Sequence, residues 1–321
     1  MEEVADSVFR RIISRCARPD VFFTEFTNCE GILSTGSGIV MQRLFFTQEE
    51  RPIVAQIWGK NPASFYEVAK KLKSMGFDGI DVNLGCPEKK VIKTGACGAL
   101  IENHSLTKEI IIATKEGARG LPVSVKTRIG FGRIETEAWT SFLLSLGIDA
   151  LTIHGRTVKE MSDVPAHWDE IGKAVQIRNS MKVKTLILGN GDIKSRQEAI
   201  DKCNQCRVDG VMIGRGVFGN LWVFSKDPSR SHNQEELFSI MDEHIRLWDE
   251  TWGSTKNFAI LKKFFKIYVS GFEHASNLRA RFMETSSCVE VQQVLSSFRN
   301  EQISKMSSHA SHLPVDYIDE V

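Results

Sequence analysis

The chain has 321 residues, of which 42% are hydrophobic and 25% charged, and its formal net charge is +1. This length suits one large α/β barrel, alone or with a small additional domain. No apolar run approaches about twenty residues, which excludes a membrane-spanning helix, and the acidic start, residues 1–6, does not resemble a signal peptide. The near-zero charge excludes a polycation, so nucleic-acid binding would need a local basic surface.

The seven cysteines are an odd number in a chain without an export signal, which indicates a reduced, cytoplasmic protein. Cys203 and Cys206 form a lone CxxC. A single pair of this kind lacks the further ligands of a structural zinc site. We therefore expect these two side chains to pack at a helix end, and we expect no bound metal.

The first predicted element is a helix over residues 6–15, with Asp6 as its N-terminal cap. Short β-branched runs then alternate with stretches whose apolar residues follow helical spacing. The predicted strands are 21–25, 53–57, 79–83, 123–127, 150–154, 186–189 and 210–213. The predicted helices between them are 63–75, 106–116, 135–146, 167–177 and 195–202.

This alternation predicts parallel strands with right-handed crossovers, and seven such units favour a closed (β/α)₈ barrel, known as a TIM barrel, over an open sheet. A first strand should precede the helix at 6–15, and no strand pattern is present there. The expected barrel therefore lacks its first strand and has two unpaired edges, which proteins normally avoid.

After Leu221 the pattern contains helices only, at 234–252, 257–271, 277–285 and 288–298. We therefore divide the chain into a catalytic barrel domain at 1–224, a helical domain at 225–300 and a polar tail at 301–321.

Barrel enzymes place their chemistry at the carboxyl ends of the strands. Nearly every predicted strand here ends in a polar or charged side chain, where structural strand ends would show more Ser, Thr and Gly. These strand-end positions are Glu25, Gln56, Asn83, Cys86, Lys126, Arg128, His154, Arg156, Asn190, Asp192, Gly214 and Arg215. Their density predicts an active site at this end of the barrel.

The last two strands are followed by glycine-rich turns, residues 189–192 and 213–216. Glycines let backbone N–H groups approach an anion, and the Arg215 guanidinium beside Gly214 can pair with its oxygens. Phosphate sites recur after the final two strands of barrel enzymes. The alternative is that both segments are tight turns that need glycine for steric reasons only.

Three strand-end groups indicate what that phosphate belongs to. The Gln56 amide can both donate and accept, His154 can donate, and Lys126 offers a cation. A flavin ring has an alternating donor–acceptor edge and becomes anionic on reduction, so a nearby lysine would stabilise its reduced form. Each residue alone could equally be structural, but together they predict flavin mononucleotide (FMN).

Cys86 follows a strand directly, between Gly85 and Pro87, which limit the conformations of its loop. A thiol with the ordinary pKa of about 8.5 is mostly protonated at neutral pH. We therefore expect Cys86 to act as a proton donor rather than as a nucleophile.

Five segments carry a resemblance to a known family: VNLGCPEKKVIKTGACGALI, SVKTRIGFG, LTIHGRT, LGNGDI and MIGRGVFGN. In their order and spacing the chain resembles the tRNA-dihydrouridine synthase family from about residue 6 to residue 224, and more weakly through the helical region. The resemblance implies an FMN-bound barrel that uses NADPH, or NADH, to reduce the C5–C6 double bond of uridines in tRNA. The target uridine would be flipped out of the RNA to reach the buried cofactor.

Carried over position by position, the resemblance makes Cys86 the general acid that protonates C5. It makes Asn83 a uracil-reading residue and Arg156 a substrate contact. The FMN-contacting positions that it implies are Gln56, Lys126, His154, Asn190, Gly191, Asp192, Gly214 and Arg215.

The helical region carries a cluster of basic residues with interleaved aromatics, at Lys256, Lys262, Lys263, Lys266, Arg279 and Arg281. A basic helical face could follow RNA phosphates, although a solvated surface above aromatic core residues would look the same. With the family resemblance we expect tRNA as partner, no membrane, no metal and a monomeric chain.

The chain departs from the family at several points. Members usually begin with an Ala-Pro-Met strand, of which Met1 would be the last residue. Members also have a Gln and a Tyr after the HGRT stretch, where residues 157–161 carry neither, and a small residue where this chain has Cys97.

Three alternatives stay open at this point. One is another FMN barrel oxidoreductase, similar to dihydroorotate dehydrogenase. The second is a catalytically inactive tRNA-binding protein without the first strand, and the third is a phosphate-binding barrel without a flavin.

Overall fold

The computed structural model describes residues 3–227 and 230–310, with side chains to residue 302. The chain divides into two compact units, Met1–Ser229 and Arg230–Val321. Each unit is described by itself.

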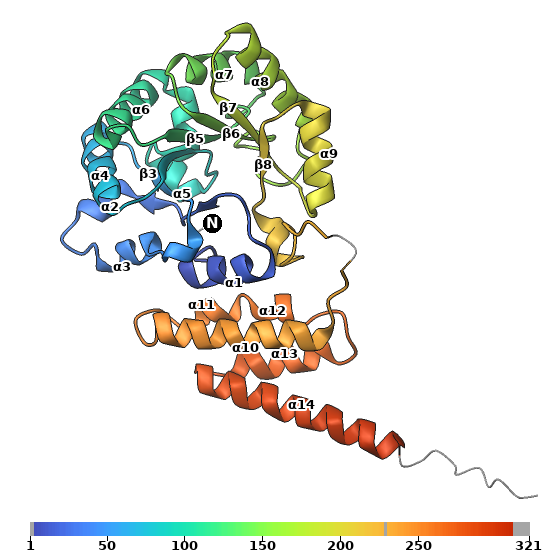
Figure 1. Cartoon of the computed structure of the whole chain (residues 1–321). Helices are drawn as coiled ribbons and strands as arrows, with labels where there is room; N and C mark the ends of the chain where they lie inside the picture. The colour runs from blue at the N-terminus through green and yellow to red at the C-terminus, as the bar shows by residue number, and fades with distance from the viewer. Residues whose placement is uncertain (1–2, 228–229, 311–321) are drawn as a thin grey trace, which may run out of the picture. The chain divides into compact units, whose positions relative to one another are not determined.

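The first unit is built on one curled sheet of parallel strands with helices on its outer face (Figure 1). Along the sheet the order is β1-β3-β4-β5-β6-β7-β8, and β2 extends the pairing of β1 with β3. The strands are β1 (Phe22–Phe23), β2 (Thr27–Asn28), β3 (Ile53–Trp58), β4 (Gly79–Leu84), β5 (Val123–Arg128), β6 (Ala150–His154), β7 (Leu186–Asn190) and β8 (Gly210–Met212).

This arrangement confirms the predicted α/β barrel type and its missing strand. Within the described residues no strand pairs β8 with β1, so the sheet stays open between its first and last strands. The single predicted strand at 21–25 is replaced by two short ones, β1 and β2, which pair with successive parts of β3.

Helices follow the strands along the chain, and polar side chains cap several of them. Asn61 caps α4 through the N–H of Ala63, and Asn103 caps α6 through the N–H of Leu106. The helices between the strands are α2 (Cys29–Leu33), α3 (Gly38–Met41), α4 (Pro62–Ser74), α5 (Lys89–Lys93), α6 (His104–Ala118), α7 (Thr136–Ser145), α8 (Trp168–Ser180) and α9 (Arg196–Cys206). Short 3₁₀ turns lie at η1 (Gln42–Leu44), η2 (Gln48–Glu50), η3 (Cys97–Glu102) and η4 (Arg215–Phe218).

The core lies between the sheet and this outer layer, where apolar strand residues such as Ile80, Val82 and Val125 are fully buried. Helices α4 and α6 pack closely because Gly117 has no side chain. A Cβ at this position would lie 2.2 Å from the carbonyl oxygen of Tyr66. The close packing of this layer supports the strands whose ends carry the polar residues.

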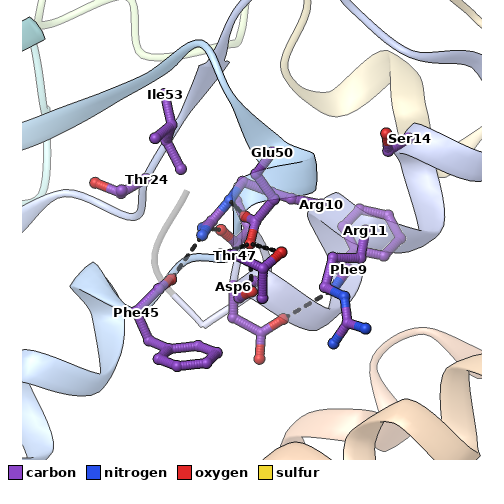
Figure 2. Close-up of polar contacts among 12 residues, drawn as sticks. Asp6, Phe9, Arg10, Arg11, Ser14, Thr24, Phe45, Thr47, Glu50 and Ile53 are labelled. Carbon is purple, nitrogen blue, oxygen red and sulfur yellow. Dashed lines mark hydrogen bonds and ion pairs between the residues drawn. The ribbon is translucent and has the colours of Figure 1, made fainter. Parts of the chain in front are cut away.

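A buried ion pair anchors α1 (Ser7–Ala17) to the segment before β3 (Figure 2). Arg10 Nε lies 2.5 Å from Glu50 Oε2, and the Ser7 hydroxyl donates to Glu50 Oε1 (2.5 Å). Asp6 accepts from the backbone N–H of Phe9 (3.0 Å), which confirms the predicted cap. Both charged side chains of the pair are almost completely shielded from solvent.

Helix α1 also contacts the opposite end of the sheet. The Phe9 ring stacks on Phe218 of η4, which follows β8, with ring centroids 5.7 Å apart. One helix is therefore tied both to the segment that leads into β3 and to the turn that follows β8. These contacts hold together the two regions that no described strand connects.

The second unit is helical, with α10 (Gln234–Thr251), α11 (Ala259–Lys262), α12 (Phe265–Tyr268), α13 (Ala275–Glu284) and α14 (Cys288–Ala310). The predicted helix at 257–271 is divided into α11 and α12. Helix α14 extends beyond the predicted boundary at residue 300, because no glycine or proline occurs before Pro314 to end it. The remainder of the predicted tail, residues 311–321, lies outside the described residues.

Candidate active site

The predicted strand-end side chains come together because every pairing in the sheet is parallel, so the carboxyl ends of the strands meet at one edge. We call this edge the barrel mouth. Residues paired across neighbouring strands point to the same face. The register pairs Gln56 with Asp81, Asn83 with Lys126, Arg128 with His154, and His154 with Asn190.

A chain of hydrogen bonds fixes the Gln56 amide. Gln56 Nε2 donates to Asp81 Oδ2 (2.7 Å), and Gln56 Oε1 accepts from Asn83 Nδ2 (3.2 Å). The Ser124 hydroxyl donates to the other oxygen of Asp81 (2.5 Å). These contacts leave Gln56 one N–H for a ligand, in a fixed orientation.

Asp81 is a member of this site that the sequence analysis did not single out. Burial raises the pKa of its carboxyl to about 6, although the hydrogen bonds from Ser124 and Gln56 and the charge of Lys126 act in the other direction. The available signal was a carboxylate within a strand that is otherwise apolar except for Gly79 and Asn83, since a buried acid needs partners. Asp81 orients the side-chain amide of Gln56, which the sequence analysis did predict as a site residue.

The loop that carries Cys86 is held on both sides. Asn83 Oδ1 accepts from the backbone N–H groups of Gly85 (3.0 Å) and Cys86 (3.1 Å). The buried Arg128 donates to the carbonyl oxygen of Gly85 (2.8 Å) and, further on, to that of Thr157 (2.8 Å). The position of the Cys86 thiol is therefore fixed by the ends of β4 and β5.

The Cys86 thiol is half-buried and has an altered acidity. A hydrogen bond from the Cys97 thiol lowers the pKa of Cys86 to about 7, against the effect of burial, with help from the backbone of Glu88 and the charge of Arg128. At neutral pH the thiol and thiolate forms are therefore comparable in population. A general acid with a pKa near the working pH is well suited to proton transfer.

Lys126 supplies a half-buried positive charge at the barrel mouth. Burial lowers the pKa of its ammonium to about 8, with a further contribution from the charge of Arg128 and opposition from Asp81 and Cys86. Within the part of the chain that the structure describes, the ammonium makes no hydrogen bond or ion pair. A poorly hydrated cation without a partner is suited to bind an anionic group.

His154 is held in one tautomer by its neighbours. Arg156 Nη1 lies 3.0 Å from His154 Nε2, and a guanidinium can only donate, so Nε2 accepts and the ring proton lies on Nδ1. Burial, followed by the charges of Lys126 and three arginines, lowers the pKa of His154 to about 2. The imidazole therefore stays neutral, with an Nδ1–H donor that no described residue engages.

Arg156 is fixed by protein groups. Its Nη2 lies 2.5 Å from Asp192 Oδ2, and its Nε donates to the carbonyl oxygen of Val164 (2.5 Å). Asp192 Oδ2 also accepts from the backbone N–H of Ala166 (2.9 Å). These contacts give Arg156 a positioning role beside His154, while the substrate contact implied by the family resemblance stays a prediction.

The two glycine-rich turns differ in what their glycines do. Gly191 has φ +134, and a Cβ there would lie 2.6 Å from the Cβ of Ala166, so steric reasons alone require glycine. A Cβ on Gly214 would meet nothing within 4 Å, which leaves space for a ligand to approach its backbone. Asn190 links the two turns, because its Nδ2 donates to the carbonyl oxygen of Met212 (2.8 Å).

Arg215, beside Gly214, is free to bind an anion. Its side chain is 61% exposed, and its closest carboxylate, on Asp192, lies 4.0 Å away. An exposed guanidinium next to an open glycine fits the phosphate of a nucleotide.

The charges around His154 also fit a flavin nucleotide. Lys126, Arg128, Arg156 and Arg215 all act on this ring, and all four lower its pKa. The positive charge, together with the fixed Gln56 amide and the Nδ1–H of His154, matches a ligand with an anionic phosphate and a donor–acceptor ring edge. The donor set present here therefore fits FMN.

In the helical unit, the interleaved aromatic residues Phe264, Phe265 and Tyr268 are buried and form core. Part of the basic cluster is bound to protein groups: Lys262 donates to the carbonyl oxygen of Met283 and Arg279 to that of Val269 (2.7 Å each). Lys263 and Lys266 are exposed. In this cluster, therefore, exposed positions are held by cations, whereas the aromatic side chains are buried.

Three further findings concern the described residues alone. Among them, no three His, Cys, Asp or Glu side chains gather in a way that could hold a metal ion. None of the helices they form combines the length and apolar character needed to cross a membrane. Cys206 packs as predicted, with its thiol 3.3 Å from the carbonyl oxygen of Trp168.

The fold and the site define an incomplete parallel α/β barrel with a cationic, thiol-bearing site at the carboxyl ends of its strands. A similar fold occurs in 2-naphthoyl-CoA reductase, with a TM-score of 0.53 and 10% identity over 69% of this chain and 46% of that chain.

Sequence comparison identifies the family. The sequence model described as dihydrouridine synthase (Dus) matches residues 1–305. A probable tRNA-dihydrouridine synthase of Staphylococcus epidermidis is 44% identical over 93% of this chain and 91% of its own length. A probable tRNA-dihydrouridine synthase 2 of Bacillus subtilis is 42% identical over 94% of this chain and 93% of its own. The chain belongs to the dihydrouridine synthase family.

Proposed function

We propose that this protein reduces the C5–C6 double bond of uridine in tRNA, with FMN as its resident cofactor and NADPH or NADH as reductant. The observation that carries the proposal is the half-buried Cys86 thiol, fixed at the end of β4 next to the unpartnered Lys126 ammonium. The names of the related proteins from S. epidermidis and B. subtilis support tRNA as the substrate.

In this proposal the barrel mouth holds FMN through two groups of residues. Gln56, Lys126 and His154 contact the ring, and Asn190, Gly191, Asp192, Gly214 and Arg215 contact the phosphate end. FMN, when bound, supplies the hydride for C6 of the uracil. Lys126 stabilises the negative charge that reduction creates, and the Nδ1–H of His154 adds a neutral donor.

Asn83 orients the uracil with the one donor it has left. Its Oδ1 already accepts from two backbone N–H groups, and its Nδ2 already donates once to Gln56. One N–H therefore remains, which suits a uracil carbonyl oxygen rather than the ring N–H. A hydrogen bond to this oxygen also stabilises the enolate charge that develops as C6 is reduced.

Cys86 completes the reaction by donating its proton to C5. Because the pKa of Cys86 is about 7, the thiol is a strong enough acid to transfer the proton and is still substantially protonated at neutral pH. The uridine reaches this thiol only when it is flipped out of the RNA stack. The exposed Lys263 and Lys266 of the helical unit contact tRNA phosphates in this proposal.

The proposal is tested by purifying the protein, recording its flavin absorbance before and after incubation with FMN, and incubating it with NADPH and tRNA that lacks dihydrouridine. We expect a yellow protein that forms dihydrouridine. The Cys86→Ala variant should keep the flavin and lose about 10²–10⁴-fold in rate, the usual contribution of general acid catalysis. Cys203→Ala removes another half-buried thiol, outside the site, and should leave the rate unchanged.

Three results would contradict the proposal. A colourless protein that takes up no added flavin would contradict FMN as the cofactor. Normal turnover by Cys86→Ala would contradict the assignment of Cys86 as the proton donor. Reduction of free uracil or orotate at the rate seen with tRNA would indicate a small-molecule oxidoreductase instead.

A further inference from the structure

Cys97 has no part in the proposed reaction, yet it contacts the proposed proton donor. The Cys97 thiol donates a hydrogen bond to the sulfur of Cys86. The next residue, Gly98, donates its N–H to the carbonyl oxygen of Cys86 (3.3 Å). Two contacts therefore join two segments whose cysteines are eleven positions apart in the sequence.

The backbone at Cys97 is unusual for its residue type. Its φ of +52 lies in the left-handed region, which glycine adopts readily and a side chain with a Cβ adopts at a cost. A residue kept in a strained conformation at a reactive site is a reason to look for a function. Here the strained residue is the one that places a second thiol against Cys86.

The two thiols differ in accessibility. Cys86 is half-buried at the barrel mouth, whereas Cys97 is 1% exposed. The hydrogen bond that lowers the pKa of Cys86 to about 7, together with burial, raises the pKa of Cys97 well above its ordinary value. Cys86 is thus the thiol that a small oxidant can reach as a thiolate, and Cys97 is a protonated thiol behind it.

We propose that Cys86 and Cys97 form a modification site for hydroperoxides, at which oxidation of Cys86 is converted to a reversible Cys86–Cys97 disulfide. The chemistry needs only the hydroperoxide as oxidant. The Cys86 thiolate attacks one peroxide oxygen, the O–O bond breaks, and with one proton the leaving oxygen departs as water or an alcohol, so that Cys86 becomes a sulfenic acid. The Cys97 sulfur then attacks the Cys86 sulfur, and the sulfenic hydroxyl leaves as water with the Cys97 proton.

The disulfide would protect Cys86 and also stop the reaction. Further oxidation of a sulfenic acid to a sulfinic acid is irreversible for most proteins, whereas a thiol reductant restores both cysteines from a disulfide. A disulfide has no proton to donate, so dihydrouridine formation would stop until reduction. This last consequence rests on the proposed function, but formation of the disulfide does not.

A third thiol, Cys29, is the alternative disulfide partner for Cys97. Cys29 is fully buried, and a negative charge on it would raise the pKa of Cys97. Burial also raises the pKa of Cys29 well above its ordinary value, which keeps this thiol protonated and unreactive. The proposal therefore specifies the pairing of Cys97 with Cys86 and not with Cys29.

The test uses the full chain, reduced, treated with a few equivalents of hydrogen peroxide at pH 7.5, blocked with N-ethylmaleimide and digested with trypsin without reduction. Cys86 and Cys97 fall in different tryptic peptides, 74–89 and 94–108. We expect these peptides to appear joined, two hydrogens lighter than their sum, and to separate after dithiothreitol. The joined species should account for most of the oxidised Cys86.

The variants are chosen to separate the roles of the two thiols. Cys97→Ser keeps a hydrogen-bond donor but cannot form the disulfide, and we expect its Cys86 to gain two oxygens as a sulfinic acid under the same treatment. Cys29→Ala should still form the Cys86–Cys97 link. Circular dichroism before oxidation checks that each variant is folded.

Two results would overturn the proposal. One is accumulation of Cys86 sulfinic acid in the unmodified chain without the joined peptides. The other is a link between Cys97 and Cys29. Because the readout is a peptide mass and needs neither tRNA nor NADPH, failure of this proposal is distinguishable from failure of the proposed function.

Discussion

Two clusters of charged residues in the barrel unit differ in how far their charges are paired within the protein. At α1, Arg10 donates to Glu50 and to the backbone carbonyl oxygen of Phe45 (Figure 2). Arg10 also donates to the carbonyl oxygen of Ala5, and Glu50 also accepts from Ser7. At the barrel mouth, the ammonium of Lys126 binds no described residue, and the Arg215 guanidinium is exposed, 4.0 Å from Asp192.

The difference separates charges that serve the fold from charges that serve a ligand. In the α1 cluster the buried charges satisfy each other, so the free energy of desolvation is largely recovered within the protein. In the mouth cluster part of the positive charge is left without a partner, which a protein tolerates when a ligand provides the missing contact. The following predictions test this contrast.

The largest effect is expected from breaking the α1 cluster. Glu50→Ala leaves Arg10 charged, buried and without its carboxylate, and removal of one partner of such a pair costs about 3–5 kcal/mol. We expect the free energy of unfolding of the barrel unit, measured with urea and circular dichroism, to fall by this amount.

The matched control replaces both partners, as Arg10→Met with Glu50→Leu. Because both charges are removed together, this double variant should lie within about 2 kcal/mol of the unmodified protein. Equal losses in the single and double variants would contradict a self-contained ion pair. The result would then point to packing of α1 as the main contribution.

Much of the fold could be predicted from the sequence, because period and polarity are local signals. The strands that became β3 to β8 and the cap at Asp6 were found in this way. The ion pair between Arg10 and Glu50 could not be, since forty residues separate its partners and neither has a distinctive local pattern. The division of the segment 257–271 into α11 and α12 was also missed, because helical spacing of apolar residues does not report a short interruption of the helix, here at Lys263 and Phe264.

For the site, the sequence predicted which residues gather but not what each one contacts. Strand-end position alone brought Gln56, Lys126 and His154 to one edge. The contacts that distinguish Arg156 from Arg215 are tertiary: the first is buried and bound to His154 and Asp192, and the second is exposed. Both arginines follow strands and look equivalent in the sequence.

The second prediction concerns Arg215 of the mouth cluster. Arg215→Ala removes an exposed guanidinium whose ion pair with Asp192 is long, at 4.0 Å, so we expect stability to change by less than about 0.5 kcal/mol. Loss of one charge-assisted hydrogen bond of about 1.5–3 kcal/mol should weaken FMN binding by about 10- to 150-fold. Quenching of flavin fluorescence measures this affinity.

Arg133→Ala provides the control for this measurement, because the Arg133 side chain is 84% exposed and forms its ion pair with Glu135, outside the barrel-mouth residues named above. We expect FMN affinity to be unchanged there. If the Arg215→Ala variant were unstable but bound FMN normally, Arg215 would serve the fold, as Arg10 and Glu50 do, rather than a ligand.

The third prediction concerns the acidity of Cys86. The hydrogen bond from Cys97 is the main reason for the pKa of about 7, so Cys97→Ala should raise this pKa toward the ordinary value. Alkylation by iodoacetamide requires the thiolate, so its rate at pH 7 should fall about tenfold. Mass spectrometry of peptide 74–89 over a range of pH gives both the rate and the pKa.

Cys97→Ser is the matched variant here, since its hydroxyl can still donate to the Cys86 sulfur. We expect its alkylation profile to stay closer to that of the unmodified protein. If neither variant shifted the profile, the low pKa of Cys86 would have to come from Arg128 and the backbone of Glu88 rather than from the Cys97 thiol.

The smallest effect is expected for the positioning contact between Arg156 and His154. Because a guanidinium can only donate to Nε2, the ring should be neutral and protonated on Nδ1 throughout pH 5.5–8, as burial and nearby cations lower the pKa of His154 to about 2. Arg156→Met removes the donor, so both tautomers should become populated.

Two-bond ¹H–¹⁵N spectra of histidine-labelled protein distinguish the tautomers, and the His154 signals are assigned by their loss in His154→Gln. Arg178→Met is the control, since Arg178 makes a comparable ion pair with Asp209 (2.5 Å) without contacting His154. A His154 ring that carries its proton on Nε2, or that titrates near pH 6.5, would contradict the hydrogen-bond assignment. It would also mean that Arg156 does not determine which donor His154 presents at the barrel mouth. Arg156 would then belong with Lys126 and Arg215, whose charges serve a ligand rather than the fold.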